Sequence, residues 1–346
     1  MNNKEIINVR LSEDETAVII LDQTLLPNET TYIKLNSAEA LFEAIYSLRV
    51  RGAPAIGIFA AYALYVLARQ IKTDHYCEFK AEVKRYSKYL DTSRPTAVNL
   101  SVQLRRMEEL VKRLAGSSIP HILQAMKEEA DKIYNEDVEM CRAISEHGLK
   151  LIRNGYGIMT QCNAGPIATS KYGTSLGPIL MGHERGMKLN AYICETRPLM
   201  QGARLTAYEL DNAGIDCTLI CDNMASIAMS EGKIDAVFSG CDRVARNGDV
   251  ANKVGTSSLA ILAKHYGIPF YVFGPTTTID FACATGDEIE IEQRKPEEIK
   301  ELFFIKPMAP AGVKCYNPAF DVTNNTLITA IITEHGIHKP NEIAKL

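Results

Sequence analysis

Two side chains that can move protons follow short apolar stretches in the second half of the chain. Cys162 comes directly after residues 156–161, and Asp242 comes shortly after residues 234–239. Both stretches have the length and the β-branched or aromatic content of buried strands. The carboxyl ends of parallel strands lie at one edge of a sheet, where loops from distant parts of the sequence build ligand pockets. We therefore expect a thiol and a carboxyl to meet at that edge and to serve acid–base chemistry.

Each of these two side chains also has a structural interpretation. Asp242 can brace its own loop, and Cys162 can be an ordinary buried cysteine. As a functional group, Asp242 would be desolvated by the apolar strand before it, which would raise the pKa of its carboxyl and keep a proton available near neutral pH. Cys162 stands before residues 163–165 at a predicted helix start, whose amide donors would make the thiol more reactive. Spacing alone leaves both interpretations open.

Basic side chains at two places in the sequence are candidates to hold an anion. Asn252 and Lys253 stand just before a predicted helix, so a cation would lie beside free helix amides, an arrangement that suits a phosphate. Arg51 lies in a break between two predicted helices, and Arg94 follows another. Their guanidinium groups match the geometry of phosphate oxygens. The structural alternatives are an ordinary helix cap and an ordinary turn.

The stretch 234–280 is expected to position Asp242. Apolar strands at 234–239 and 268–273 flank a helical pattern at 253–266, which ends at Gly267. Strand, helix and strand in this order predict a βαβ unit whose two strands are parallel. The connection before the helix is longer than the usual two to six residues, which favours a functional loop.

The same alternation extends over the second half of the chain and predicts its fold. Strands are expected at 156–161, 190–195, 216–221, 234–239 and 268–273, with helices near 166–171, 201–213, 223–231, 253–266 and 324–335. The first half predicts two strands within 17–35 and then helices at 38–49, 54–68, 76–90, 96–114 and 119–152. The prediction is an α/β protein. A smaller, mostly α N-terminal domain with a short antiparallel β element (1–150) precedes a doubly wound, parallel-sheet domain (151–346).

Composition excludes several functional classes. A net charge of −4 argues against a nucleic-acid partner, which requires neutralisation of phosphates. No GxGxxG follows a predicted strand and no P-loop is present, and the seven histidines lack ligand spacing, so neither an organic cofactor nor a metal is expected. The apolar run 53–68 is too short to cross a membrane. Nine cysteines without a CxxC pair, and an N-terminus without an apolar signal region, predict a cytoplasmic protein with reduced thiols.

Six segments resemble the methylthioribose-1-phosphate isomerase family, and together they cover almost the whole chain. They are RGAPAIG (51–57), TQCNAG (160–165), ETRPLMQGARLTAYEL (195–210), GCDRVARNGDVANKVGT (240–256), GIPFYVFGPTTTID (267–280) and NPAFDVT (317–323). The resemblance implies a Rossmann-like C-terminal domain, a homodimer and no cofactor. The apolar stretch 54–68 is a candidate dimer contact.

The resemblance also implies roles for individual residues. Cys162 and Asp242 would be the catalytic pair. The residues that hold the substrate would be Arg51, Gly52, Ala53, Arg94, Gln201, Asn252 and Lys253. The chain departs from the family pattern at Gln161, where a His is common, at Cys241, where an Ala is common, and at Asn324, where a Pro often follows the Thr. These departures bear on the group that the sugar carries at C5.

The reaction that the resemblance implies is an aldose–ketose isomerisation. The substrate would be 5-methylthioribose 1-phosphate, in methionine salvage, or 5-deoxyribose 1-phosphate, each converted to the ribulose 1-phosphate. A hydrophobic pocket distinguishes such apolar C5 groups by only about 1–3 kcal/mol per methylene. Two alternatives stay open: a ribose-1,5-bisphosphate isomerase, which needs a second cationic site, and a non-catalytic regulatory subunit that senses a sugar phosphate or nucleotide.

Overall fold

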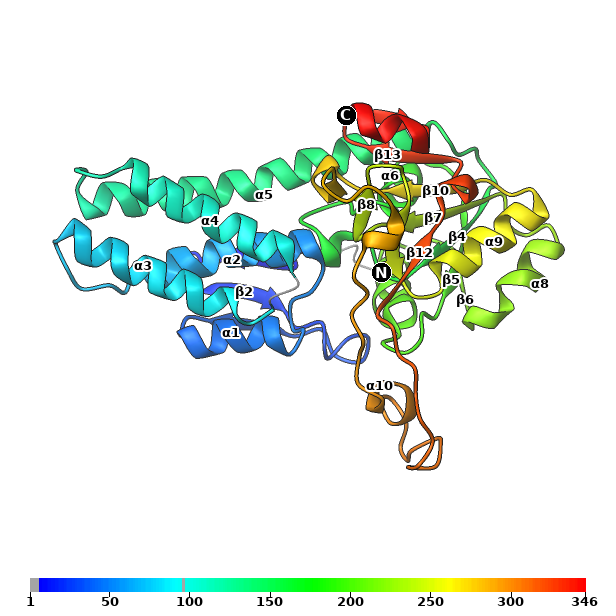
Figure 1. Ribbon diagram of the computed structural model, residues 1–346, viewed down its shortest axis with the longest axis horizontal. Coiled ribbons are helices and arrows are strands. Elements are labelled where there is room, and N and C mark those ends of the chain that lie inside the picture. Colours follow the sequence, from blue (N-terminus) through cyan, green and yellow to red (C-terminus); the bar gives the residue numbers. More distant parts are fainter. Residues whose placement is uncertain (1–5, 95–96) are drawn as a thin grey trace. The chain divides into compact units, whose positions relative to one another are not determined.

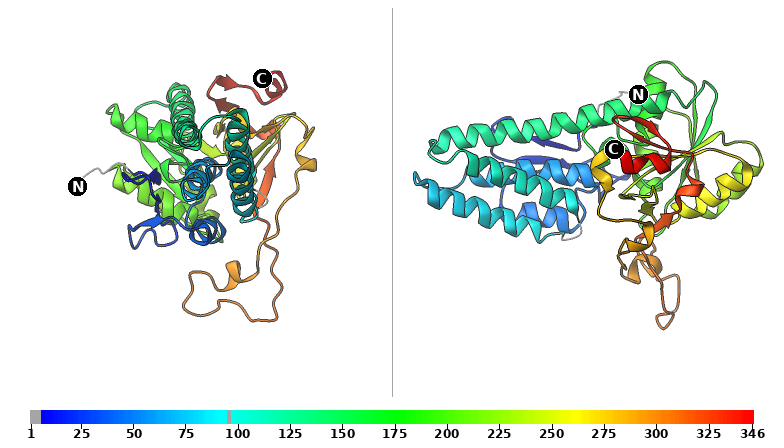
Figure 2. Two further views of the ribbon diagram at one scale, coloured as in Figure 1. Left: turned by 90° about the vertical axis from the view of Figure 1, so that its left-hand side faces the viewer. Right: turned by 45° about the horizontal axis from the view of Figure 1, so that its top comes forward.

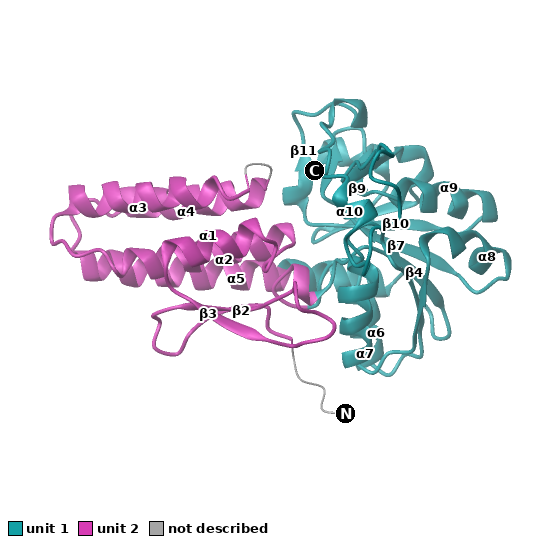
Figure 3. Cartoon of the chain, turned by 90° about the horizontal axis from the view of Figure 1, so that it is seen from below, with its two compact units in different colours: residues 1–4, 140–165, 172–346 teal, residues 5–139, 166–171 magenta. Residues whose placement is uncertain are grey.

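The computed structural model describes residues 6–94 and 97–346, which form two compact units (Figure 3). We call them the helical unit (the described residues up to Glu139, with Pro166–Lys171) and the sheet unit (Met140–Gly165 and Tyr172–Leu346). The chain passes between the units inside one long helix, α5 (Ile119–Leu149), and again on either side of residues 166–171. The division into two domains at residue 150, which the sequence predicts, stays a prediction.

The helical unit combines a small antiparallel sheet with helices. Its strands are β1 (Val9–Leu11), β2 (Val18–Leu21) and β3 (Tyr32–Leu35) in the order β1-β2-β3, and its helices are α1 (Ala38–Tyr46), α2 (Ala53–Ala68), α3 (Tyr76–Asp91), α4 (Val98–Arg113) and the first part of α5. These helices match the predicted ones, although residue 96, the predicted start of α4, lies outside the described residues. The prediction that β strands precede a mostly helical region is confirmed.

Helix α2 is the centre of the helical unit (Figure 1). Every residue from Ala55 to Ala68 is buried, because α3, α4 and the strands surround a helix that is apolar on all sides. At Gly57 the approach of α4 is close: a Cβ atom there would lie 3.1 Å from the Gln103 side chain. The suggestion that stretch 54–68 contributes a dimer contact is therefore wrong, because its side chains are buried in the core of the helical unit itself.

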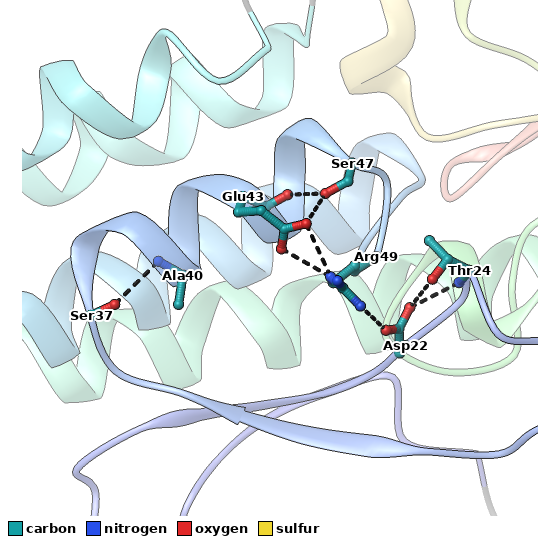
Figure 4. Close-up of polar contacts among 7 residues, drawn as sticks. All are labelled: Asp22, Thr24, Ser37, Ala40, Glu43, Ser47 and Arg49. Carbon is teal, nitrogen blue, oxygen red and sulfur yellow. Dashed lines mark hydrogen bonds and ion pairs between the residues drawn. The ribbon is translucent and has the colours of Figure 1, made fainter.

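A network around Arg49 anchors the turn between α1 and α2 (Figure 4). The Arg49 guanidinium forms ion pairs with Asp22, whose side chain is 1% exposed, and with Glu43 at 2.9 Å. The Arg49 carbonyl accepts the Gln23 amide at 3.0 Å. At the start of α1, the Ser37 hydroxyl accepts the amide of Ala40. The turn that carries residues 51–53 is thus tied to α1 and to the end of β2.

The sheet unit contains a seven-stranded sheet with the order β14-β13-β10-β7-β4-β5-β6 (Figures 1 and 2). Its strands are β4 (Gly157–Gln161), β5 (Asn190–Cys194), β6 (Cys217–Ile220), β7 (Ala236–Gly240), β10 (Phe270–Phe273), β13 (Ala330–Thr333) and β14 (Gly336–His338). All neighbours are parallel except the last pair, β13 and β14. β5 and β6 lie on one side of β4, and β7, β10, β13 and β14 lie on the other, so the strand order reverses between β4 and β7.

Helices cover both faces of this sheet. Helices α8 (Ala225–Ser230) and α9 (Thr256–Tyr266) contribute to the core on one face, and α6 (Gly177–Glu184), α7 (Ala207–Asn212) and the end of α5 contribute to the core on the other. Alternate residues of β7 enter the two cores: Val237 enters the first, and Ala236 and Phe238 the second. The predicted doubly wound α/β arrangement and the βαβ unit β7–α9–β10 are confirmed.

A second sheet lies beside the strand ends, with the order β11-β8-β9-β12. Its strands are β8 (Arg243–Ala245), β9 (Val250–Lys253), β11 (Ile279–Asp280) and β12 (Phe320–Thr323). Between β11 and β12 the chain forms an arm that carries α10 (Glu297–Lys300) and extends from the sheet unit (Figure 2). The expected functional loop between residues 240 and 253 is therefore largely a β-hairpin.

The predicted terminal helix near 324–335 is wrong. Asn324 does act as an N-cap, accepting the amide of Thr326 at 3.0 Å, but it caps only the short 3₁₀ turn Asn325–Leu327. The chain then enters β13, whose β-branched residues are buried on both faces of the sheet. Three other boundaries also differ. The helix predicted at 166–171 is a 3₁₀ turn (Pro166–Ala168), α6 was not predicted, and α9 begins at Thr256 because residues 250–253 are a strand.

Among residues 6–94 and 97–346, none of the helices combines the length and the apolar character that a membrane crossing requires.

Asp249 is expected to be a large contributor to the stability of the sheet unit. Its carboxylate accepts hydrogen bonds from Asn247, the amide of Gly286, and both the amide and the side chain of Asn325, at 2.8–3.0 Å. Burial by itself raises the pKa of Asp249, but these hydrogen bonds outweigh it, and the net pKa lies below the usual value. Asp249→Asn would place an amide donor against these donors, and we expect it to lower the free energy of unfolding by about 2–4 kcal/mol at pH 7.

Urea unfolding at several pH values checks this prediction and its sign. A carboxyl whose pKa is lowered by folding stabilises the fold above its unfolded pKa of about 3.9 and loses that contribution as the pH falls through its folded pKa. The difference in the free energy of unfolding between wild type and Asp249→Asn should therefore become smaller below about pH 4. The exposed Asp287→Asn serves as control and should behave like wild type. A gap that persists unchanged into acid would contradict the ionic origin of the effect.

Candidate active site

Cys162 and Asp242 follow the two neighbouring strands between which the strand order reverses. β4 and β7 are parallel and paired, with Gln161 opposite Ser239. Cys162 is the next residue after Gln161, and Asp242 lies three residues after Ser239. At Gly240, a Cβ atom would lie 2.9 Å from the Cβ of Ala164, so the two loops are in contact. The structure thus brings the predicted thiol and carboxyl to one edge of the sheet, at the switch point where ligands bind in open α/β sheets.

The backbone of Cys162 is held from both sides. Its N–H donates to Thr196 Oγ1 at 2.9 Å, and its carbonyl accepts from Thr206 Oγ1 at 2.7 Å. The Thr196 hydroxyl in turn donates to the Cys194 carbonyl at 3.0 Å. Cys162 itself has φ 64°, in the left-handed region, and is 8% exposed. The thiol therefore belongs to a turn with a fixed, unusual conformation and not to a regular helix start.

Unusual backbone conformations cluster around this turn. Thr196 (φ 67°) and Met200 (φ 58°) are also left-handed, although a β-branched residue such as Thr196 rarely adopts this conformation. The segment continues into a π-helix at Gly202–Thr206, a form that is frequent at functional sites. Strained residues of this kind persist only where the surrounding structure determines them, and they concentrate at active sites.

Two buried side-chain oxygens at this edge have no hydrogen-bond donor among the described residues. They are Gln201 Oε1, on a residue that is 3% exposed and precedes the π-helix, and Asn163 Oδ1, on the residue after Cys162. The Asn163 amide nitrogen is engaged, donating to Glu209 at 2.5 Å and to Thr206 at 3.2 Å. Buried acceptors without donors are rare in folded proteins. Both oxygens can accept hydrogen bonds from the hydroxyl groups of a bound sugar.

Asp242 differs from the expectation in one physical respect. Its amide donates to the Ala251 carbonyl at 2.9 Å, which fixes its place in the hairpin, but its side chain is exposed. The preceding strand therefore does not bury this side chain as expected, because the side chain emerges after the strand has ended. Desolvation falls on its neighbour instead: burial raises the pKa of the Cys241 thiol to about 12, against a hydrogen bond with Thr278, so Cys241 stays protonated at neutral pH.

Asn252 and Lys253 occupy successive positions on β9, so their side chains leave opposite faces of the strand. Asn252 is buried and donates to Ser239 Oγ at 2.9 Å and Thr256 Oγ1 at 3.1 Å, which ties it to the end of β7. The Lys253 ammonium donates to the Ala319 carbonyl at 2.9 Å and lies 4.5 Å from the centre of the Phe320 ring. Asn252 therefore contacts the end of β7, whereas the Lys253 ammonium contacts Ala319 and Phe320.

The expectation of free amides at the start of α9 is wrong for two of them, those of Gly255 and Ser257. The Asp321 carboxylate accepts the amides of Gly255 at 2.7 Å and Ser257 at 3.1 Å, together with the Ser257 hydroxyl. Burial raises the pKa of Asp321 although these hydrogen bonds act in the opposite direction. An internal carboxylate thus occupies amides that a phosphate would need.

The helical unit holds the remaining predicted residues. Gly52 is the N-cap of α2 with φ 94°, and a Cβ there would lie 2.3 Å from the Ala168 carbonyl oxygen, so only glycine fits. Ala53, the next residue, is exposed. Arg51 is partly buried, and its Nη1 has no hydrogen-bond acceptor among the described residues. Arg94 follows α3, and its carbonyl accepts the Ala97 amide at 3.0 Å. Arg51 is therefore a guanidinium suited to an external anion.

Sequence reasoning missed the residues that support Cys162. Thr196 and Asp222 were visible as polar residues after predicted strands, but their function as hydrogen-bond partners was not. Asp222 accepts the amides of Thr196 at 2.8 Å and Arg197 at 2.7 Å. Thr206 and the buried Glu209 lie inside a predicted helix, where periodicity alone gives no sign of a polar network.

The chain matches known proteins over nearly its whole length. Residues 49–340 match the model of the initiation factor 2 subunit family. The chain is 56% identical to the methylthioribose-1-phosphate isomerase of Symbiobacterium thermophilum, covering 97% of this chain and 94% of that protein. It is 54% identical to the 5-deoxyribose 1-phosphate isomerase of Petrotoga mobilis, covering 96% and 95%.

Two solved structures share the fold. The 5-methylthioribose 1-phosphate isomerase of Pyrococcus horikoshii has a TM-score of 0.93 at 37% identity, covering 99% of this chain and 96% of that one. The delta subunit of translation initiation factor eIF-2B from A. fulgidus has a TM-score of 0.90 at 38% identity, covering 99% and 100%.

Proposed function

This chain belongs to the initiation factor 2 subunit family and is an aldose–ketose isomerase of sugar phosphates, and we propose that Cys162 and Asp242 carry its reaction. The substrate is 5-methylthioribose 1-phosphate, as in methionine salvage, or 5-deoxyribose 1-phosphate. The observation that supports the assignment of the two residues is their position after β4 and β7, the adjacent strands at the switch point.

Ring opening is the first chemical requirement of this reaction. The phosphate is attached to the anomeric carbon, so breaking the bond from C1 to the ring oxygen gives no free aldehyde: the ring oxygen takes a proton, and C1 is left as a cation stabilised by the oxygen of its phosphate ester. We assign the proton donor for the ring oxygen to Asp242. Its side chain is exposed in the structure, and a bound sugar that covers it would supply the desolvation that favours the protonated carboxyl.

Two routes lead from the opened sugar to the ketose. In the first, Cys162 is the base that removes the proton from C2 of the C1 cation, which gives an enol phosphate. The same proton or one from solvent is then delivered to C1, while the C2 hydroxyl loses its proton and becomes the ketone. In the second, the hydrogen on C2 moves with its electron pair to the cationic C1, and a base need only take the proton of the C2 hydroxyl. Substrate carrying deuterium at C2 distinguishes them: loss of deuterium to water supports the enol route, and complete retention at C1 supports the hydride route.

We propose that the substrate is held by the residues that the family resemblance implies. In the sheet unit, Gln201 presents a buried oxygen that has no donor among the described residues, and Asn252 lies against the β7 strand end. Lys253 contributes positive charge. In the helical unit, Arg51 carries a buried guanidinium nitrogen that has no acceptor in the described part of the chain. The proposal completes the set with Gly52, Ala53 and Arg94.

A panel of substrates that differ only at C5 tests the proposed function. We expect turnover of both the 5-methylthio and the 5-deoxy sugar, because an apolar pocket discriminates such groups by only about 1–3 kcal/mol per methylene. Ribose 1,5-bisphosphate should be turned over at least about 1,000-fold less efficiently, because a second dianion requires a further cationic site. Ketose formation is followed by ¹H NMR.

Two outcomes of this panel would contradict the proposal. Preference for the bisphosphate would support the alternative isomerase. Binding of all the sugars without turnover of any would support a regulatory subunit, the alternative that the similarity to the A. fulgidus delta subunit favours.

We also propose a homodimer and a cytoplasmic location. Both rest on the family resemblance, and the nine free cysteines are compatible with a reducing compartment. Sedimentation equilibrium of the purified protein tests the dimer: a mass near 38.3 kDa at micromolar concentration would contradict it.

A further inference from the structure

The Cys162 peptide is gripped by two threonine hydroxyls that come from a single segment of the chain. Thr196 Oγ1 accepts its N–H at 2.9 Å, and Thr206 Oγ1 donates to its carbonyl at 2.7 Å. Both threonines are fully buried. Thr196 lies two residues after β5 and Thr206 is the last residue of the π-helix. β5 and the π-helix contact each other, so both hydrogen bonds depend on one local structure.

This grip acts on a residue that would not hold its conformation alone. Cys162 is left-handed, with φ 64°, and such a conformation costs a non-glycine residue about 1–2 kcal/mol. A neutral hydrogen bond contributes about 0.5–1.5 kcal/mol net. Two such bonds therefore match the cost, and the loss of either would let the turn relax toward a conformation that aims the side chain elsewhere.

The two threonines are themselves anchored by carboxylates. Asp222, after β6, accepts the amides of Thr196 and Arg197, which fixes the left-handed Thr196. The buried Glu209 accepts from the Asn163 side chain, which also donates to Thr206 Oγ1 at 3.2 Å. Glu209 further packs against Gly165, where a Cβ would lie 2.4 Å from Glu209 Oε2. The orientation of Cys162 is thus determined by a continuous network from β6 to α7.

We propose that Thr196 and Thr206 are positioning residues for the isomerisation, which hold the Cys162 thiol in its reactive orientation through its backbone. This inference rests on the proposed function of Cys162. Neither hydroxyl has a spare proton for the substrate, because each donates its own to a backbone carbonyl. Their effect is on geometry, and small misplacements of a reacting group of about 1 Å can cost about 100-fold in rate.

The test compares Thr196→Val and Thr206→Val, which keep the shape and remove the hydroxyl, with Thr196→Ser and Thr206→Ser, which keep the hydroxyl. We expect each valine variant to lose about 30–100-fold in kcat while KM stays within about threefold. Each serine variant should recover to within about threefold of wild type. Thr323→Val is the matched control, since Thr323 is equally buried and its hydroxyl has no partner among the described residues. Calorimetric titration with the ketose product gives the binding stoichiometry, which measures the fraction of each variant that is folded and able to bind.

A second measurement reports on Cys162 without any turnover. Iodoacetamide labelling is followed by peptide mass spectrometry, with the exposed Cys77 of the helical unit as internal reference. Since Cys162 is 8% exposed in its fixed turn, release of the turn should raise its labelling rate relative to Cys77 by at least about fivefold in both valine variants. The control and the serine variants should keep the wild-type ratio.

The outcomes separate this proposal from the proposed function. Valine variants with wild-type kcat and wild-type labelling would overturn the positioning role while the isomerase activity stands. A fall in kcat that matches a fall in binding stoichiometry, with unchanged labelling, would also overturn it, because the residues would then be needed only for folding. If wild type itself fails to isomerise any sugar of the panel, the proposed function fails, and the labelling ratios still decide whether the two hydroxyls hold Cys162.

Discussion

Asp242→Asn is expected to lower kcat by about 100–10,000-fold and to leave KM within about threefold, because general acid catalysis contributes this much and an amide cannot deliver the proton. The replacement keeps the size of the side chain. The backbone bond from the residue-242 amide to the Ala251 carbonyl does not involve the side chain, so the hairpin should stay intact. NMR turnover assays and product-binding calorimetry give the two quantities.

Asp216→Asn is the matched control for this variant. Asp216 is an exposed aspartate of the same unit, but it precedes β6 and so lies at the amino edge of the sheet, opposite to Asp242. It should be indistinguishable from wild type. An Asp242→Asn enzyme that keeps more than about a tenth of the wild-type kcat would contradict the acid role, because the expected range starts at 100-fold.

Arg51→Ala is expected to raise KM by about 10–150-fold with kcat within about fivefold, since hydrogen bonds to a charged group contribute about 1.5–3 kcal/mol. The Arg51 Nη1 atom is buried without an acceptor among the described residues, so the free protein gains nothing from it. Its removal should therefore leave the melting temperature unchanged or raise it slightly. The inhibition constant of inorganic phosphate should rise in parallel with KM.

Arg49→Ala, two residues away, should lower the stability of the protein and have little direct effect on KM. Arg49 neutralises the buried Asp22, and loss of its guanidinium should destabilise the helical unit by about 2–4 kcal/mol. The two variants together separate an arginine that holds the fold from one that holds a ligand. If Arg51→Ala leaves KM and phosphate inhibition unchanged, the phosphate is bound elsewhere.

Elements with local signals were the predictable part of the fold. The strands β4 to β7 and β10 are short apolar runs, and α9 ends at a left-handed Gly267, so both their type and their order follow from the chain. Elements that depend on distant partners were not predictable. β8 and β9 are three- and four-residue strands in a polar segment, and β9 pairs with β12, about seventy positions later in the chain. Asn324 gave a true capping signal for a turn too short to be a helix.

The candidate site follows the same division. The positions of Cys162 and Asp242 could be predicted because ligands bind beyond the carboxyl ends of parallel strands, a rule that needs only strand boundaries. The hydrogen-bond acceptor of the amides at the start of α9 could not be predicted, because Asp321 belongs to a strand that is distant in the sequence. The exposure of Asp242 could not be predicted either, because it changes if the strand ends one or two residues earlier or later.

The most direct test of the account is a crystal structure of the Asp242→Asn variant with 5-methylthioribose 1-phosphate bound. The account predicts the sugar at the ends of β4 and β7, with the Cys162 sulfur and the side chain of residue 242 each within about 3.5 Å of it, the latter at the ring oxygen. A sugar bound at another edge of the molecule, or one that reaches only one of these two side chains, would contradict it.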